Sequence, residues 1–322
     1  MIRGLLADQG YRPHFTGHST FPLRYGWLKK AFDAVHKVDN KRNNKSKIFL
    51  DESSIANFGV GKNMVEAIRH WAQVTDVIEE GTEENSLRTT VFGQALFEDT
   101  GLDPYLENPS SLWLIHWKLC SAAKKTTWHW AFNYYTSSTF EREQLVSGLV
   151  KLAIDAEWPR ISPNTIKRDV DCFVRTYVAR PIKNKEAHED SLECPLAELG
   201  VIRSVGTRDG FRFVHGLKPS LGNGAFLSAL VEFWKEYSPS ATTLSFEALM
   251  HEPGSPGRVF LLDENDIADR LFLLEDLTHG KIRWSETAGM KQVVREVELA
   301  EVNPVECLRV DYLPSEKQRA AE

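Results

Sequence analysis

The segment from Ser162 to Tyr177 is the feature of the sequence that most restricts the fold. Ser162 is a favourable helix N-cap residue, and Pro163 suits the first helical position. The apolar residues that follow share one helical face: Ile166, Val170, Phe173, Val174 and Tyr177. Polar and basic residues point away from it: Asn164, Thr165, Lys167, Arg168 and Arg175. With the amphipathic helix predicted over residues 141–157, the segment indicates a helix–turn–helix with a basic outer face.

Two other regions combine predicted helices with short β-hairpins. A helix is predicted to begin near Gly61, with His70 outside its apolar stripe. Strands predicted at 77–78 and 87–92 then flank an acidic loop, which gives the element order of a winged helix. Near the C-terminus, helices predicted over 224–237, 246–251 and 259–277 precede a hairpin over 281–298, which again resembles a winged helix.

These patterns predict an α+β fold, mainly α, built from multiple winged-helix and helix–turn–helix modules. The expected domains are an N-terminal signature and winged-helix domain over 1–140, a helix–turn–helix segment over 141–185, and a C-terminal winged-helix-like domain over 186–322. A hairpin is also expected over 201–214. Periodicity does not decide between helix and strand for the aromatic cluster at 128–135.

Composition excludes several protein classes. Hydrophobic residues make up 42% of the 322 residues, but no apolar run approaches the ~18 residues of a membrane span. The first fifteen residues lack the apolar stretch of a signal peptide. The four cysteines form no CxxC pair, which excludes a zinc ribbon and disfavours a disulfide framework. We therefore expect a reduced, cytoplasmic protein without membrane partners.

The net charge of -6 is unevenly distributed. Residues 1–50 carry ten Lys/Arg against three Asp/Glu, and residues 160–185 carry seven against two. Residues 246–322 carry nine against sixteen. Basic stretches attract phosphate groups even on an acidic protein, although a charge run is also typical of a solvated loop.

Common nucleotide and hydrolase signatures are missing from the sequence. The run from Gly59 to Asn63 superficially resembles a phosphate loop, but one residue separates its glycines and Asn follows the Lys. Neither a GxSxG nucleophile elbow nor an HExxH metal pair occurs. Lys62 and Asn63 instead occupy a predicted helix start, where phosphate oxygens are favoured.

An N-terminal cluster offers polar groups for phosphodiester chemistry. Asp33 and His36 are three residues apart, so they share a helical face and could hold a divalent metal or activate water. Arg24 could clamp a phosphate. The alternative is structural: Asp33 pairs with Lys29 or Lys30, and His36 lies exposed.

Several blocks, in order over nearly the whole chain, match a known family. They are HFTGHSTFPLRYGWLKK from His14, GVGKNMVEAIRHW from Gly59, DPYLE from Asp103, LWL from Leu112, SPGRVF from Ser255 and TAG from Thr287. The chain resembles a family of unknown function found with DNA phosphorothioation gene clusters, although Ser19 stands where the family's signature usually has Glu. One component of these anti-phage systems is described as a DNA nickase, which makes the break at which sulfur enters the backbone.

The resemblance implies a DNA nickase that acts on double-stranded DNA with a divalent metal, Mg²⁺ or Mn²⁺. Its implied partners are a cysteine desulfurase, an ATPase and an ATP pyrophosphatase-type enzyme. Within the signature we expect Asp33 and His36 to hold metal or activate water, His18 to protonate the leaving group and Arg24 to bind the phosphate. The expected DNA contacts are Lys30, Lys41, Arg42, Lys62, Asn63, Arg69, Thr165, Lys167, Arg168, Arg175 and Arg258.

Two other functions fit the same residues. A non-catalytic winged-helix adaptor would bind DNA and recruit the sulfur-transfer enzymes without cutting. A protein–protein scaffold, which the acidic C-terminal region would suit, would show no salt-dependent affinity for DNA.

Overall fold

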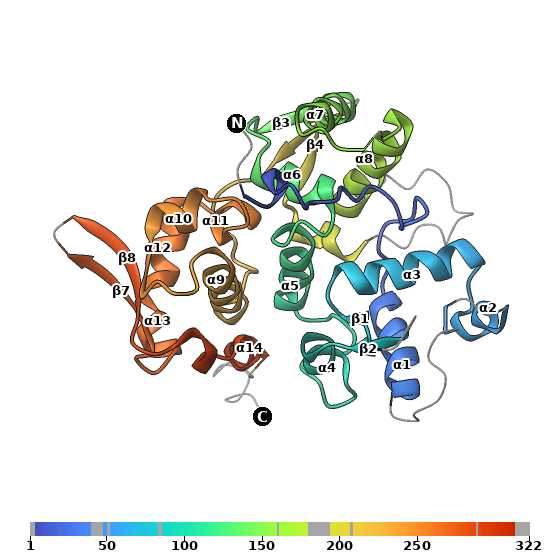
Figure 1. The fold of residues 1–322 in the computed structure, drawn as a ribbon. Helices are drawn as coiled ribbons and strands as arrows, with labels where there is room; N and C mark the ends of the chain where they lie inside the picture. The colour runs from blue at the N-terminus through green and yellow to red at the C-terminus, as the bar shows by residue number, and fades with distance from the viewer. Residues whose placement is uncertain are drawn as a thin grey trace. The chain divides into compact units, whose positions relative to one another are not determined.

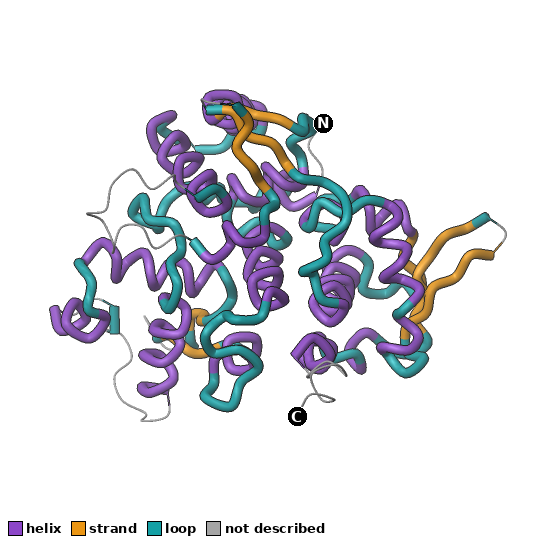
Figure 2. The backbone as a smooth tube through the Cα atoms, turned by 180° about the vertical axis from the view of Figure 1, so that it is seen from behind, coloured by secondary structure: helices purple, strands orange, loops and turns teal. Residues whose placement is uncertain are grey.

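The chain is mainly helical, with small antiparallel sheets, in two units (Figure 1, Figure 2). The computed structural model describes residues 4–39, 48–49, 52–82, 86–159, 161–179, 194–206, 209–287 and 289–312. Unit 1 comprises Met1–Leu106 and Lys118–Val214, and unit 2 comprises Glu107–Trp117 and His215–Glu322. The predicted class, α+β and mainly α, is confirmed.

The N-terminal part of unit 1 packs helix α1 against helix α3 and a two-stranded hairpin. Its elements are η1 (Gly4–Ala7), α1 (Trp27–Asp39), α2 (Glu52–Phe58), α3 (Lys62–Val74), β1 (Ile78–Glu80), β2 (Leu87–Thr89) and α4 (Val91–Phe97). The apolar stripe predicted for α3 is largely buried, and Trp71 on α3 and Phe32 on α1 are among the largest buried side chains. His70 is buried too, contrary to the helical spacing, because the loop around Gly17 covers it.

The rest of unit 1 contains the two helices predicted around Trp158 and a three-stranded sheet. Its elements are α6 (Thr126–Asn133), β3 (Thr139–Glu141), α7 (Arg142–Asp155), α8 (Pro163–Tyr177), η3 (Pro195–Leu199), β4 (Ile202–Val205) and β5 (Gly210–Phe213). Helices α7 and α8 pack together, and the whole predicted stripe of α8 is buried. Ser162 occupies the N-cap position without a side-chain hydrogen bond, and Pro163 is the first helical residue.

Unit 2 is built around helix α9, most of whose residues are buried. Its elements are most of α5 (Pro109–Cys120), α9 (Asn223–Tyr237), β6 (Thr243–Ser245), α10 (Phe246–His251), α11 (Pro256–Val259), α12 (Glu264–Phe272), α13 (Leu274–Leu277), β7 (Ile282–Thr287), β8 (Met290–Arg295), η4 (Leu299–Glu301) and α14 (Pro304–Tyr312). Helix α14 packs on α9, where the Asp311 carboxylate accepts hydrogen bonds from the backbone N–H groups of Gly224 and Ala225, both at 2.8 Å.

The two units repeat one order of elements. Unit 1 has α6, β3, α7, α8, β4 and β5, with the sheet order β3-β5-β4. Unit 2 has α9, β6, α10, α12, β7 and β8, with the sheet order β6-β8-β7. In each sheet the strand before the helix pair lies beside the last strand, and all pairings are antiparallel.

The three predicted hairpins are confirmed as β1–β2, β4–β5 and β7–β8, and the aromatic cluster at 128–135 is helical as far as Asn133, the end of α6. The third strand of each sheet, β3 or β6, was not predicted. The segment 259–277, predicted as largely helical, is divided among α11, α12 and α13, and Leu261 between α11 and α12 adopts a left-handed conformation with φ 55°. In the described part of the chain, none of the helices has the length and hydrophobicity to span a bilayer.

Candidate functional site

The signature loop, residues 14–24, is irregular and is fixed by hydrogen bonds to other parts of unit 1. The backbone N–H of His14 donates to Thr126 Oγ1 at 2.7 Å, at the start of helix α6. Arg175 Nη1 on α8 donates to the carbonyl oxygen of Thr20 at 3.0 Å. Ser19 and Thr20 both adopt left-handed backbone conformations, with φ 46° and 69°. Because such conformations are costly for residues other than glycine, the surrounding contacts must impose this path.

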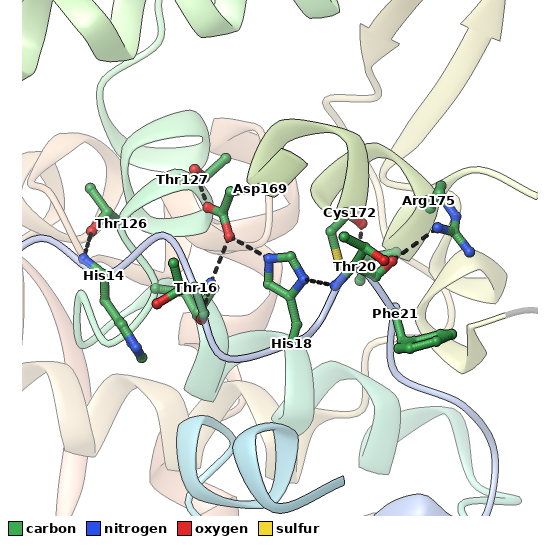
Figure 3. A network of polar contacts seen from close by, with 12 residues as sticks. His14, Thr16, His18, Thr20, Phe21, Thr126, Thr127, Asp169, Cys172 and Arg175 are labelled. Carbon is green, nitrogen blue, oxygen red and sulfur yellow. Dashed lines mark hydrogen bonds and ion pairs between the residues drawn. The ribbon is translucent and has the colours of Figure 1, made fainter. Parts of the chain in front are cut away.

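Asp169 on α8 is the centre of the network beneath this loop (Figure 3). Its side chain is completely buried and accepts hydrogen bonds from Lys125 Nζ at 2.7 Å, His18 Nε2 at 2.8 Å and Thr127 Oγ1 at 2.5 Å. Burial alone would raise the pKa of Asp169, but the charge of Lys125 and the hydrogen bond from His18 outweigh it and lower the pKa to about 2. The cluster is therefore an ionised buried pair whose hydrogen bonds attach the loop to α8.

His18 has both ring nitrogens occupied. Nε2 donates to Asp169, and Nδ1 accepts from the backbone N–H of Thr20 at 3.0 Å. This pattern assigns the neutral tautomer with its proton on Nε2. The side chain is 3% exposed. These contacts do not favour the predicted role of His18 as a proton donor to a leaving group, because no nitrogen is left to face a substrate.

His70 on α3 completes a cluster of three histidines under the loop. Its ring centroid lies 5.3 Å from that of His14 and 6.2 Å from that of His18. A Cβ atom at Gly17, where φ is 98°, would lie 2.3 Å from His70 Nδ1, so only glycine fits there. Burial, and then the charge of Lys125, hold the pKa of His70 well below its ordinary value. His70 Nε2 is buried without a hydrogen-bond partner among the described residues.

The other predicted catalytic residues lie in or near α1 and have different neighbours. The Arg24 guanidinium lies over the rings of Phe21 and Trp27, at 5.7 and 5.6 Å from their centroids. Lys29 Nζ contacts Asp33 Oδ1 at 2.8 Å, which is the structural alternative considered for Asp33. His36 stacks on Phe32 with ring centroids 5.2 Å apart.

Asp33 and His36 do not make a ligand set that fits Mg²⁺. Asp33 offers one carboxylate, which is already paired with Lys29, and His36 offers a nitrogen where Mg²⁺ prefers oxygen. No group of three or more His, Cys, Asp or Glu side chains suited to a metal occurs in the described ranges. We therefore assign no reaction step to a metal held by these two residues.

The predicted DNA-contact residues fall on several elements. Lys167 and Arg168 are exposed on α8 and Thr165 is half-buried there, while Lys62 and Asn63 are exposed at the start of α3. Three other predicted contacts donate hydrogen bonds to backbone carbonyl oxygens: Arg175 to Thr20, Lys30 Nζ to Phe58 at 3.2 Å, and Arg258 Nε to His251 at 3.3 Å. Arg69 is half-buried. Lys41 and Arg42 lie outside the described residues.

The sequence matches, over residues 15–312, the family described as protein of unknown function (DUF4007). The chain belongs to this family. Two solved structures resemble the fold. A crystal structure of magnesium ion-bound SspB has a TM-score of 0.83 and 28% identity, covering 99% of this chain and 95% of that one. Another SspB crystal structure has a TM-score of 0.81 and 30% identity, covering 96% and 90%. No curated protein sequence matches.

Two blocks on which the family resemblance rests meet in the cluster. The signature loop supplies Gly17 and His18, and the block from Gly59 to Trp71 supplies His70, while α8 contributes Asp169. Sequence reasoning missed Lys125, His70 and Asp169. Asp169 carried a detectable signal, because it lies between Ile166 and Val170 beside the apolar stripe, where a carboxylate requires a buried partner.

Proposed function

We propose that the chain binds duplex DNA and nicks it, as a component of a DNA phosphorothioation system. The observation that carries the proposal is the similarity to SspB, which extends over 99% of the chain at a TM-score of 0.83. The same neighbour binds a magnesium ion, which makes Mg²⁺ the first cation to test. The DNA-binding part of the proposal also has support from the surface of unit 1.

We propose α8 as the recognition helix of a winged-helix module formed by residues 126–213. The element order, a helix, a strand, two helices and a hairpin, with the first strand beside the last, supports this proposal. Lys167 and Arg168 are exposed near the start of α8, and no acidic residue occupies its first turn. A positive helix N-terminus with basic side chains suits a DNA phosphate backbone.

In this proposal the Asp169 cluster positions residues and does not react with DNA. It attaches the signature loop to α8 through His18, and Arg175 of α8 adds a second attachment at Thr20. The loop and the recognition helix would therefore approach DNA together. Arg24, the last residue of this loop, is the proposed phosphate ligand of the nicking reaction.

A plasmid assay tests nicking. Supercoiled plasmid is incubated with the protein and Mg²⁺ or Mn²⁺, with EDTA as the control, beside Arg24→Ala and Asp33→Ala. We expect conversion to open circle by the wild type and its loss in Arg24→Ala while that variant remains folded. Equal nicking by wild type and both variants would contradict the assignment of the site. Arg12→Ala, which removes an exposed arginine just before the loop, serves as a matched charge control.

A second candidate is a DNA-binding adaptor that cuts nothing. It is favoured by the occupied nitrogens of His18 and by the poor fit of Asp33 and His36 to Mg²⁺. It predicts a shifted DNA band in a gel and no open circle with either cation. If partner proteins of the system restore cleavage, the chain contributes to nicking only within a complex.

A further inference from the structure

The sheet of unit 1 has one apolar face and one basic face. Ile202, Phe211 and Phe213 are buried, whereas Arg203 and Arg212 are exposed on the other side of the β4–β5 hairpin. The antiparallel register places Arg203 directly opposite Arg212. Thr139 of β3 is the neighbour of Arg212 on its other side, so the row across the sheet contains two positive charges and no carboxylate.

Two like charges at directly opposed positions repel each other, because their Cβ atoms lie only about 5 Å apart. Neither arginine has an ion pair with another described residue. The carboxylates of β3 and of the hairpin turn are engaged elsewhere: Glu141 on β3 forms a capping box at the start of α7, and Asp209 in the turn contacts Arg142. The hairpin therefore carries a repulsion that an anion placed over the row would remove.

In the second sheet, which has the same strand order, charged side chains are paired with side chains of opposite charge. On the β7–β8 hairpin Glu286 lies opposite Lys291, a pair of unlike charges. Arg283 Nε contacts Glu296 Oε1 at 2.8 Å. The helix equivalent to α8 is α12, whose first turn contains Glu264 and Asp266. Among the described residues, an arginine pair without a counter-charge is thus a property of the unit 1 sheet and not of the strand order itself.

We infer that Arg203 and Arg212 bind phosphate oxygens of the DNA backbone beside the site occupied by α8. The planar guanidinium matches a phosphodiester oxygen pair, and two such groups side by side suit a polyanion. The inference deepens the proposed function and rests on its DNA-binding part. It makes the β4–β5 hairpin a second DNA-contact surface in addition to α8, and it assigns no DNA contact to the β7–β8 hairpin.

Fluorescence anisotropy with a labelled duplex, measured between 50 and 250 mM NaCl, tests the inference. Each lost phosphate contact lowers the slope of log K against log salt concentration by about 0.9. For Arg203→Gln/Arg212→Gln we therefore expect weaker binding and a slope reduced by about two. The matched control is Arg88→Gln/Arg283→Gln, which removes two exposed arginines already paired with Glu79 and Glu296 and should leave the slope unchanged.

Arg212→Glu separates binding from folding. It creates an unlike pair opposite Arg203, so we expect an equal or higher Tm together with weaker DNA binding, a combination that an unfolded variant cannot produce. If the wild type binds DNA but the double variant keeps its slope, the arginines face something other than DNA, such as an acidic protein, and the inference is wrong. If the wild type shows no salt-dependent DNA binding, the DNA-binding proposal itself fails and this inference with it.

Discussion

Replacing Asp169 by Asn is expected to destabilise unit 1 strongly. The substitution keeps the shape of the side chain but leaves Lys125 fully buried without its counter-charge. Its remaining hydrogen-bond acceptor in the described network is the carbonyl oxygen of Thr16, at 3.5 Å. Removing one partner of a buried pair costs about 3–5 kcal/mol. The lowered pKa of Asp169, about 2, has the same cause, because Lys125 and His18 favour the ionised carboxylate that the substitution removes.

Urea unfolding monitored by tryptophan fluorescence measures this loss. Trp128 is a local reporter, because Lys125 Nζ lies 5.1 Å from the centroid of its ring. The control is Asp33→Asn, which removes the partner of Lys29 at a 37% exposed carboxylate and should cost at most about 1 kcal/mol. Adding Lys125→Met to Asp169→Asn should recover part of the loss, because the buried charge is then removed. A loss below about 1 kcal/mol for Asp169→Asn would refute the buried ion pair.

Three further outcomes are expected. Gly17→Ala should lower the free energy of unfolding by about 1–3 kcal/mol, because its Cβ would meet the ring of His70 at 2.3 Å; thermal melting measures this, and an unchanged Tm would contradict the packing. Burial lowers the pKa of His116 and His129 to about 4, so the unfolded chain takes up protons below pH 6.5 that the folded chain excludes. The contribution of these two histidines to the free energy of unfolding is therefore fully present above pH 6.5. It is lost as the pH falls toward 4, by up to roughly 1.4 kcal/mol per pH unit for each histidine. Equal urea midpoints at pH 7 and 5 would argue against neutral buried rings. Replacing Lys167 and Arg168 together by Gln should weaken duplex binding and reduce its salt slope by about two, and unaltered anisotropy titrations would remove α8 from the DNA interface.

Local periodicity predicted the helices well because their buried faces are set by residues close in sequence. The stripe of α8 is the clearest example, with Val170 and Phe173 fully buried. Strands β3 and β6 have three residues each and gain their conformation by pairing with β5 and β8, far along the chain. So short a segment contains too few alternations to indicate a strand.

The candidate site was predicted less well because its contacts are non-local. Helical spacing placed His70 outside the apolar stripe, but the loop at Gly17 covers that side of α3. His18 belongs to the predicted signature, yet its partner Asp169 is on α8 and lies 151 residues away. The spacing of Asp33 and His36 predicted that they act together on one face of α1, whereas the structure shows Asp33 paired with Lys29. A sequence pattern gives the face of a helix but not what comes to cover it.

The strand order also determines when each sheet can form during synthesis. In both sheets the central strand is the last to be made, since β5 lies between β3 and β4, and β8 between β6 and β7. Strand β3 therefore cannot pair until Gly210–Phe213 has left the ribosome. The chain between β3 and β5 must then close into a long loop, and this costs entropy before the pairing can stabilise the sheet. Until then helices α7 and α8 lie beside an incomplete sheet, and Phe140 lacks the covering contact with its partner Phe211. The nascent chain is thus most exposed to misfolding and aggregation just before each hairpin emerges.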